Sequence, residues 1–250
     1  SMNIVVCISS VPDTTTKINF TNNNSELDQE GVQFVINPYD EFGLTKAMFL
    51  KEANGGTVTV INVGTNKNDP VIRKSLAIGA DKAIRINSKP TDSYSTANEI
   101  AHYLKNNPAD LIIAGRESID YNGGAVPGIL AELLDIPLIN ACIGLDIIDE
   151  GVKGIRETEG GKETIAAKLP LIIGGQKGLV QESELRIPNM RGIMQARTKP
   201  LEVVEPVTNG ESFTKSITFK KPDAKKTCKI IDKDNVKELV NLLQTEAKVI

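Results

Sequence analysis

The segment LIIAGRESIDYNGGAVPGIL, residues 111–130, indicates the fold class most clearly. It begins with an unbroken apolar run, Leu111–Ala114, continues through a glycine-rich polar loop, and enters a helical pattern that reaches Leu134. A short, wholly apolar run is typical of a strand that is buried on both faces of a parallel sheet. A strand, a glycine-rich loop and a helix in this order predict one unit of a layered α/β fold.

The same alternation fills the first half of the chain. Four further short runs rich in Val and Ile predict strands: Ile4–Ile8, Val32–Ile36, Val58–Val63 and Ala83–Ile86. Amphipathic stretches predict the helices: Tyr39–Ala53, Pro70–Ile78, Ser95–Leu104 and Ala125–Leu134. Because such units connect by right-handed crossovers, we expect a mostly parallel open sheet flanked by helices, with the Rossmann-like architecture of adenine-nucleotide-binding domains.

The pattern then changes to a β-hairpin. Val152–Glu157 and Glu163–Lys168 flank a turn that contains two adjacent glycines, which are suited to positive φ. Leu171–Ile173 predicts one more strand, whereas residues 174–210 show little periodicity.

The end of the chain has a different character. A polar, Lys-rich stretch follows Pro206, and an amphipathic helix is predicted over Asp232–Ala247. We therefore divide the chain into an α/β body with its hairpin, residues 2–205, and an extended arm with a helix, residues 206–250, that wraps a partner.

Composition excludes several functions. The net charge of −3, from 29 Lys and Arg against 32 Asp and Glu, argues against a nucleic-acid partner. Three scattered cysteines without a CxxC pair argue against structural zinc and for a reducing compartment. A single histidine, His102, excludes most histidine-based catalysis and is expected at the surface or as a cap. Since no apolar run suits a signal peptide or a transmembrane segment, we expect a cytoplasmic protein.

The glycine-rich loop is a candidate anion site. Ligands of open α/β sheets bind beyond the carboxyl ends of strands, where loops enter helices. Gly123 and Gly124 leave room for a phosphate to approach the backbone, and the helix dipole favours an anion by roughly 0.3–1 kcal/mol. Neither GxGxxG nor a P-loop pattern is present. From these residues alone, a turn that merely caps the helix is an equally open alternative.

A second loop, Asn37-Pro38-Tyr39-Asp40, follows the run that ends at Ile36. Asn37 is suited to capping the next helix, and Pro38 to its first turn. Both loops are expected at one edge of the sheet, so this loop is also a candidate ligand contact. Cys7 is expected to be a small buried side chain near a base or ribose rather than a nucleophile.

Several segments in order resemble the beta (small) subunit of electron transfer flavoproteins. The matching segments are Ile4–Asp13, Ile36–Glu41, Ile72–Asp81, Arg156–Thr164 with Lys168–Pro170, and Arg191–Arg197. The hairpin segment is the most specific, because it resembles the family pattern of an Arg-Glu start, a Gly-Gly turn, a Glu and then Lys-Leu-Pro. The resemblance covers nearly the whole chain.

The resemblance implies a heterodimer with a larger alpha subunit, which holds most of the redox FAD. The beta subunit would bind AMP or, in electron-bifurcating members, a second FAD, and the residues leave this choice open. By resemblance, the nucleotide contacts are Cys7, Asn37, Pro38, Tyr39, Asp40, Val63, Asn122, Gly123, Gly124, Ala125, Val126, Pro127, Gly128, Ile129, Leu130 and Ala131. Such a subunit is an electron carrier between flavin dehydrogenases and a quinone oxidoreductase or similar acceptor, not an enzyme in itself.

The resemblance also implies a loop that docks partner dehydrogenases. Met190 stands where the family has an apolar anchor, and Arg191, Ile193 and Met194 follow it. An ordinary exposed methionine is the alternative.

Two other functions remain open. One is a stand-alone adenine-nucleotide-binding sensor module. The other is an enzyme acting on a nucleotide, against which the lack of a nucleophile–base constellation argues.

Overall fold

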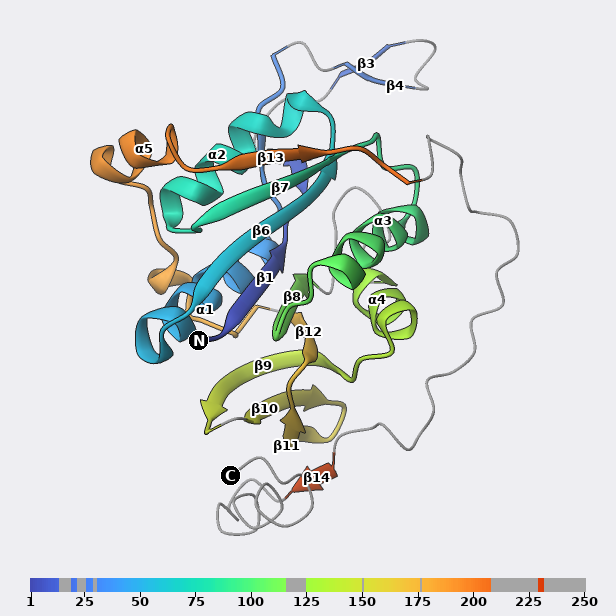
Figure 1. The fold of residues 1–250 in the computed structure, drawn as a ribbon, viewed down its shortest axis with the longest axis vertical. Helices are drawn as coiled ribbons and strands as arrows, with labels where there is room; N and C mark the ends of the chain where they lie inside the picture. The colour runs from blue at the N-terminus through green and yellow to red at the C-terminus, as the bar shows by residue number, and fades with distance from the viewer. Residues whose placement is uncertain are drawn as a thin grey trace.

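The computed structural model describes residues 1–13, 19–21, 26–28, 31–115, 125–149, 151–175, 177–207 and 229–231. Its central sheet has ten strands in the order β13-β7-β6-β1-β8-β12-β9-β10-β11-β14 (Figure 1). The strands are β1 Asn3–Cys7, β6 Thr57–Gly64, β7 Lys82–Asn87, β8 Leu111–Gly115, β9 Leu138–Ile148, β10 Gly151–Thr158, β11 Gly161–Lys168, β12 Leu171–Gly175, β13 Leu201–Val204 and β14 Lys229–Ile231. Neighbours from β13 to β9 are parallel, and those from β9 to β14 are antiparallel. The predicted α/β class with a mostly parallel sheet is confirmed.

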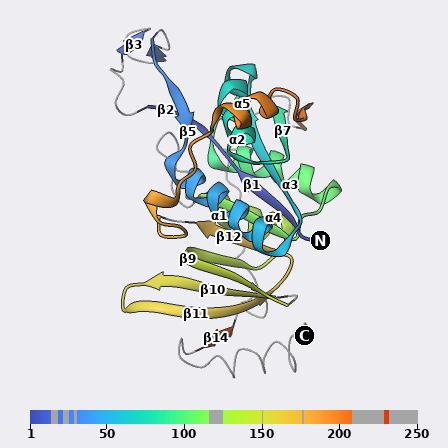
Figure 2. The same cartoon turned by 90° about the vertical axis from the view of Figure 1, so that its left-hand side faces the viewer.

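Helices cover both faces of the parallel part. They are α1 Pro38–Asn54, α2 Asp69–Ile78, α3 Ser93–Asn106, α4 Val126–Leu134 and the short α5 Met190–Ala196, with 3-10 turns η1 Asn66–Asn68 and η3 Glu182–Glu184. Figure 2 looks onto the side that carries α1, α2 and α5, whereas α3 and α4 lie on the other side.

Alternation along β1 explains these two layers. Ile4 and Val6 belong to the core cluster that includes Leu44 of α1 and Leu76 of α2. Val5 and Cys7 point to the opposite cluster, where Ile100 of α3 and Leu130 of α4 pack. Successive side chains of a strand point to opposite faces, so an unbroken apolar run is what two helix layers require.

One predicted strand is placed differently. Of the run Val32–Ile36, only Phe34–Ile36 is extended; it forms β5 and pairs antiparallel with β2, Ser10–Pro12, outside the central sheet. A parallel neighbour needs a crossover connection, usually a helix, and the described residues before β5 contain no helix. β5 pairs instead with the extended segment that directly follows β1. A second small pair joins β3, Asn19–Thr21, to β4, Glu26–Asp28.

Residues 174–210 contain more structure than their composition predicts. They hold α5 and β13, and β13 extends the sheet beside β7. Seven-residue and four-residue elements are too short for a periodic pattern to reveal. The eleven-residue β9 is also unpredicted, since Asn140, Gly144 and Asp146 interrupt its apolar pattern.

A bulge in β9 separates the parallel sheet from the hairpin. Ala141 has φ 54, in the left-handed region. The register of β9 shifts at this point against both β12 and β10. Bulges bend a strand and increase its twist, and Figure 1 shows β9 curving away from β12. The bend lets the hairpin β10–β11 continue the sheet in a new direction, and Gly161 at φ 138 confirms the predicted glycine turn.

The arm is described only in part. Lys229–Ile231 form β14, which pairs with β11 at the edge of the sheet. The helix predicted over Asp232–Ala247 lies outside the described residues, so the division at residue 206 stays a prediction. No helix in the described part of the chain is long and apolar enough to cross a bilayer.

Candidate functional site

A hollow lies at the carboxyl ends of β1, β6 and β8, where the strand order reverses. The chain runs outward from β1 to β6 and β7, and then returns through α3 to β8 on the other side of β1. Such a switch point is where open α/β sheets bind ligands. The lining residues are Cys7, Ile8, Ser9, Ser10, Val11, Asn37, Asp40, Asn62, Val63, Asn68, Pro90, Asp92, Ser93, Thr96, Ile100, Ala114, Gly115 and Val126.

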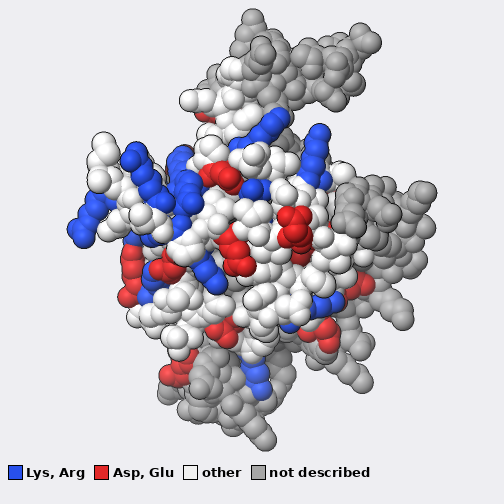
Figure 3. Space-filling view, turned by 45° about the horizontal axis from the view of Figure 1, so that its top comes forward, with Lys and Arg blue, Asp and Glu red and all other residues white. Residues whose placement is uncertain are grey.

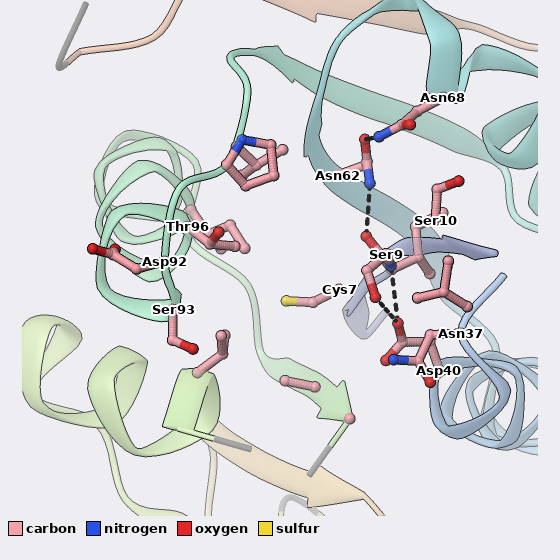
Figure 4. Close-up of a pocket in the computed structure, with 18 residues that line it drawn as sticks. Cys7, Ser9, Ser10, Asn37, Asp40, Asn62, Asn68, Asp92, Ser93 and Thr96 are labelled. Carbon is pink, nitrogen blue, oxygen red and sulfur yellow. Dashed lines mark hydrogen bonds between the residues drawn. The ribbon is translucent and has the colours of Figure 1, made fainter. Parts of the chain in front are cut away.

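The two loops singled out in the sequence meet here. Cys7, Asn37, Asp40, Val63 and Val126, which were all predicted as nucleotide contacts, line the same hollow. Figure 4 shows Asn37 and Asp40 on one wall, with α3 forming the opposite wall and Cys7 between them.

The other predicted contacts that the structure describes do not line the hollow. Pro38 and Tyr39 form the first turn of α1 without lining the hollow, and Ala125, Pro127 and Gly128 lie where α4 begins. Ile129, Leu130 and Ala131 pack in the core beside α3. Asn122, Gly123 and Gly124 lie outside the described residues.

Asp40 joins three segments at the centre of this site. Its Oδ2 accepts hydrogen bonds from the Ser9 backbone N–H at 2.9 Å and from Ser9 Oγ at 3.0 Å. The Gly115 backbone N–H also donates to this carboxylate. A side chain at position 115 would collide with Asp40 Oδ1, so glycine is required there. Asp40 therefore ties α1 to the ends of β1 and β8.

Burial changes the protonation of two side chains in the hollow. It raises the pKa of Asp40 from its ordinary 3.8 to about 7, although the bonds from Ser9 and Gly115 act in the opposite direction. Burial, and to a lesser extent the charge of Asp40, raises the pKa of the Cys7 thiol. A buried neutral thiol packs rather than attacks, which agrees with the role predicted for Cys7.

The polar residues on the β6 side were missed in the sequence. Asn62 Nδ2 donates to the Ile8 carbonyl at 2.9 Å, and Asn68 Nδ2 donates to Asn62 Oδ1 at 3.0 Å. Asn62 is almost fully buried in β6, within a run whose other residues are Val, Ile and one Thr. A polar side chain inside a buried strand could have revealed this part of the site. A buried amide needs hydrogen-bond partners, so other polar groups must lie near it.

The three helices that open onto the hollow differ in their N-terminal groups. The Asn37 side chain accepts the Tyr39 N–H at 3.1 Å in α1, and Asp40 adds a carboxylate to that turn. In α3, Asp92 Oδ1 accepts the Ser95 N–H at 2.7 Å in a capping box. The N-cap of α4, Ala125, offers no side-chain cap, and the first turn holds no acidic residue.

An incoming anion therefore meets an acidic side chain at the start of α1 and of α3, and none in the first turn of α4. The hollow also has apolar walls, including Val63, Ile100 and Ala114. Ser10 Oγ and Asp92 Oδ2, in residues that line it, are buried without a hydrogen-bond partner in the described structure. These features fit a nucleotide. The apolar walls can hold a base, the two buried oxygens can bond to polar groups of the ligand, and the N-terminus of α4 carries no acidic group that would repel a phosphate.

The sheet order, the two helix layers and the hollow at the switch point define a Rossmann-like α/β domain. Residues 26–209 match the family model described as the electron transfer flavoprotein domain. The chain is 37% identical to electron transfer flavoprotein subunit beta of Bacillus subtilis (strain 168), with 100% of both chains covered. It is 31% identical to the subunit of the same name from Syntrophomonas wolfei, covering 90% of this chain and 88% of that one. Protein FixA of Azotobacter vinelandii is 30% identical, with 88% and 80% covered. This chain belongs to the electron transfer flavoprotein beta-subunit family, which confirms the resemblance.

The buried carboxyl of Asp40 predicts a pH-dependent stability. The unfolded chain releases this proton near pH 4 and the folded chain only near pH 7, so ionisation costs the folded state stability as the pH rises through that window. We expect Asp40→Asn to gain roughly 2–4 kcal/mol relative to the wild type between pH 4 and pH 7. Urea unfolding of both proteins at four pH values measures this difference. Ser9→Ala removes one donor and should move the window to higher pH. A difference between Asp40→Asn and wild type that stays constant with pH would contradict the assignment.

Proposed function

We propose that this chain is the beta subunit of a heterodimeric electron carrier, paired with a larger alpha subunit that holds most of the redox FAD. Electrons would come from flavin dehydrogenases and pass to a quinone oxidoreductase or similar acceptor. Full-length similarity to proteins named as beta subunits is the observation that carries this proposal. It also disfavours the stand-alone sensor, because those relatives are named as subunits.

The chain's own ligand in this proposal is AMP or a second FAD, held in the hollow at the switch point. The N-terminal turn of α4 would hold the phosphate, since the corresponding turns of α1 and α3 are occupied by Asp40 and Asp92. The apolar wall with Cys7 and Val63 would hold the base. The bound flavin of the complex supplies the redox chemistry, and these residues bind and orient the nucleotide.

The segment from Leu185 to Arg197, which we name the docking segment, is the proposed contact with dehydrogenases. Four of its apolar side chains are exposed: Ile187 by 91%, Met190 by 73%, Met194 by 60% and Ile193 by 42%. Exposed apolar clusters of this kind are typical of interaction sites, and flexible methionines suit varied partners.

The charges of the docking segment indicate the partner surface. No acidic residue occurs between Leu185 and Leu201. Arg191 and Arg197 are exposed, and neither has a carboxylate partner in the described part of the chain. Figure 3 shows basic side chains gathered among uncharged ones at the end of the molecule formed by α5. An apolar hollow with an acidic rim on the dehydrogenase would complement this surface.

Co-expression with the alpha-subunit gene tests the assembly. We expect a yellow heterodimer with flavin absorbance, from which acid extraction and chromatography release one FAD together with either AMP or a second FAD. A colourless monomer under these conditions would contradict the proposal.

Charge at the first turn of α4 should control nucleotide binding. Val126→Asp places a carboxylate where the phosphate is proposed, and an acidic residue in a first turn does not weaken the helix itself. We expect the affinity of the heterodimer for its nucleotide to fall at least about tenfold, by electrostatic repulsion of about 1.4 kcal/mol or more, and less nucleotide to remain after purification. Val126→Asn is the matched control, because it loses the same valine contacts without adding charge, and it should keep its nucleotide. Equal loss in both variants would place the phosphate elsewhere.

Met190→Ala should slow electron transfer from the donor dehydrogenase about tenfold or more, because a docking anchor would be lost. Stopped-flow reduction of the heterodimer by its dehydrogenase measures the rate, and the bound cofactors should be unchanged. Val203→Ala is the control, since Val203 is 48% exposed but lies on β13, outside the docking segment. If Met190→Ala behaves like Val203→Ala, the docking assignment is wrong.

A further inference from the structure

The docking segment is fastened to the body at its C-terminal end by two cations. Arg73 of α2 donates to the Ala196 carbonyl at 2.8 Å and to the Lys199 carbonyl at 2.6 Å. Lys199 in turn donates to the carbonyls of Leu76 and Ala80 at 2.9 and 2.8 Å. Each cation thus donates to carbonyls at or just beyond the C-terminal end of the neighbouring helix, where intrahelical donors are lacking.

Close backbone packing completes this attachment. A Cβ on Gly192 would lie 2.6 Å from the carbonyl oxygen of Ala77, so α5 rests directly on α2. The Asn189 side chain caps α5 by accepting the Gly192 N–H at 2.8 Å. The C-terminal half of the docking segment is therefore rigidly held.

In the N-terminal half, the side chain of Arg186 links the docking segment to α1. Its guanidinium donates to Glu52 Oε2 at 2.7 Å and lies 2.6 Å from Glu52 Oε1, which gives a two-pronged pair. The same guanidinium lies over the Phe49 ring, 5.3 Å from its centroid. Both partners belong to the last part of α1. Paired and stacked together, an arginine fork has a fixed direction that a lysine cannot reproduce.

Only Ile187 and Pro188 separate Arg186 from Asn189. Ile187 carries the most exposed of the large apolar side chains in the described part of the chain. The direction in which the chain leaves Arg186 therefore sets where Ile187 points and how the chain approaches Met190. The docking segment is thus attached at both ends. The pair between Arg186 and Glu52 holds one end on α1, and α5 holds the other end on α2.

We infer that Arg186 is a positioning residue, which preorganises the docking segment for its partner by holding it on α1. This inference rests on the proposal that the segment docks dehydrogenases. The side chains of Arg186 and Glu52 are 33% and 50% exposed, and such half-exposed pairs contribute little to global stability. Their loss should therefore free the segment without unfolding the domain. Binding would weaken because the partner must then order the segment itself.

Three variants of the heterodimer test this role. For Arg186→Ala, we expect amide exchange in residues 187–190 to accelerate several-fold, while exchange in α2 and the melting temperature stay unchanged. With a dehydrogenase that reduces the wild-type heterodimer, the KM for the heterodimer should rise several-fold at constant kcat. Arg186→Lys should resemble Arg186→Ala, because it keeps the charge but loses the fork and the stacking. The charge-swapped double variant, Arg186→Glu with Glu52→Arg, should restore both the exchange rate and KM.

The failures of the two ideas are distinguishable. Unchanged amide exchange in Arg186→Ala would overturn the positioning role. So would faster exchange without a change in KM, if Met190→Ala still slows electron transfer, and in that case the docking proposal would stand. If neither variant affects electron transfer, docking through this segment is itself wrong and the positioning role fails with it.

Discussion

The shared carboxylate of Asp40 is the interaction on which the functional end of this molecule depends. It accepts hydrogen bonds from Ser9, which follows β1, and from Gly115, the last residue of β8. The strand order of the sheet reverses between these two strands. Burying this carboxylate costs free energy, which is why its pKa is raised. Without the carboxylate, the backbone N–H groups of Ser9 and Gly115 would lose their acceptor. The same carboxylate keeps anions away from the start of α1, so it determines which end of a nucleotide could lie there.

The two proposed functions of the chain use the same scaffold at different places. Asn68, immediately before α2, lines the hollow, whereas Arg73 and Ala77 further along that helix hold α5 and the docking segment. Helix α1 acts likewise, with Asp40 in its first turn and Glu52 near its last. Rigid helices packed on one sheet can thus hold a bound nucleotide and a partner surface in fixed relation. This geometry suits a subunit whose work is binding and positioning rather than bond chemistry.

Much of this arrangement follows from local patterns in the sequence. Short apolar runs predicted five strands of the sheet, β1, β6, β7, β8 and β12, and a glycine turn predicted the hairpin β10–β11. Amphipathic stretches predicted the helices α1 to α4. Strand ends followed by loops predicted that the loops holding Asn37, Asp40 and Val126 would lie at one edge of the sheet. The rest depends on tertiary contacts. The bulge at Ala141, the short α5 and the edge strand β13 have no periodic pattern of their own. Asn62 and Asp92 join the site because of where their strand and helix lie, and the pairing of Arg186 with Glu52 spans 134 residues of sequence.

The central claim is that this subunit binds a nucleotide with its phosphate at α4 and its base near Cys7. An experimental structure of the heterodimer with its nucleotide bound tests this most directly. We expect phosphate oxygens within hydrogen-bond distance of backbone N–H groups in the first turn of α4, with Asp40 away from the phosphate. A phosphate seated against Ser9 and the first turn of α1, or a hollow that holds no nucleotide in the active heterodimer, would contradict it.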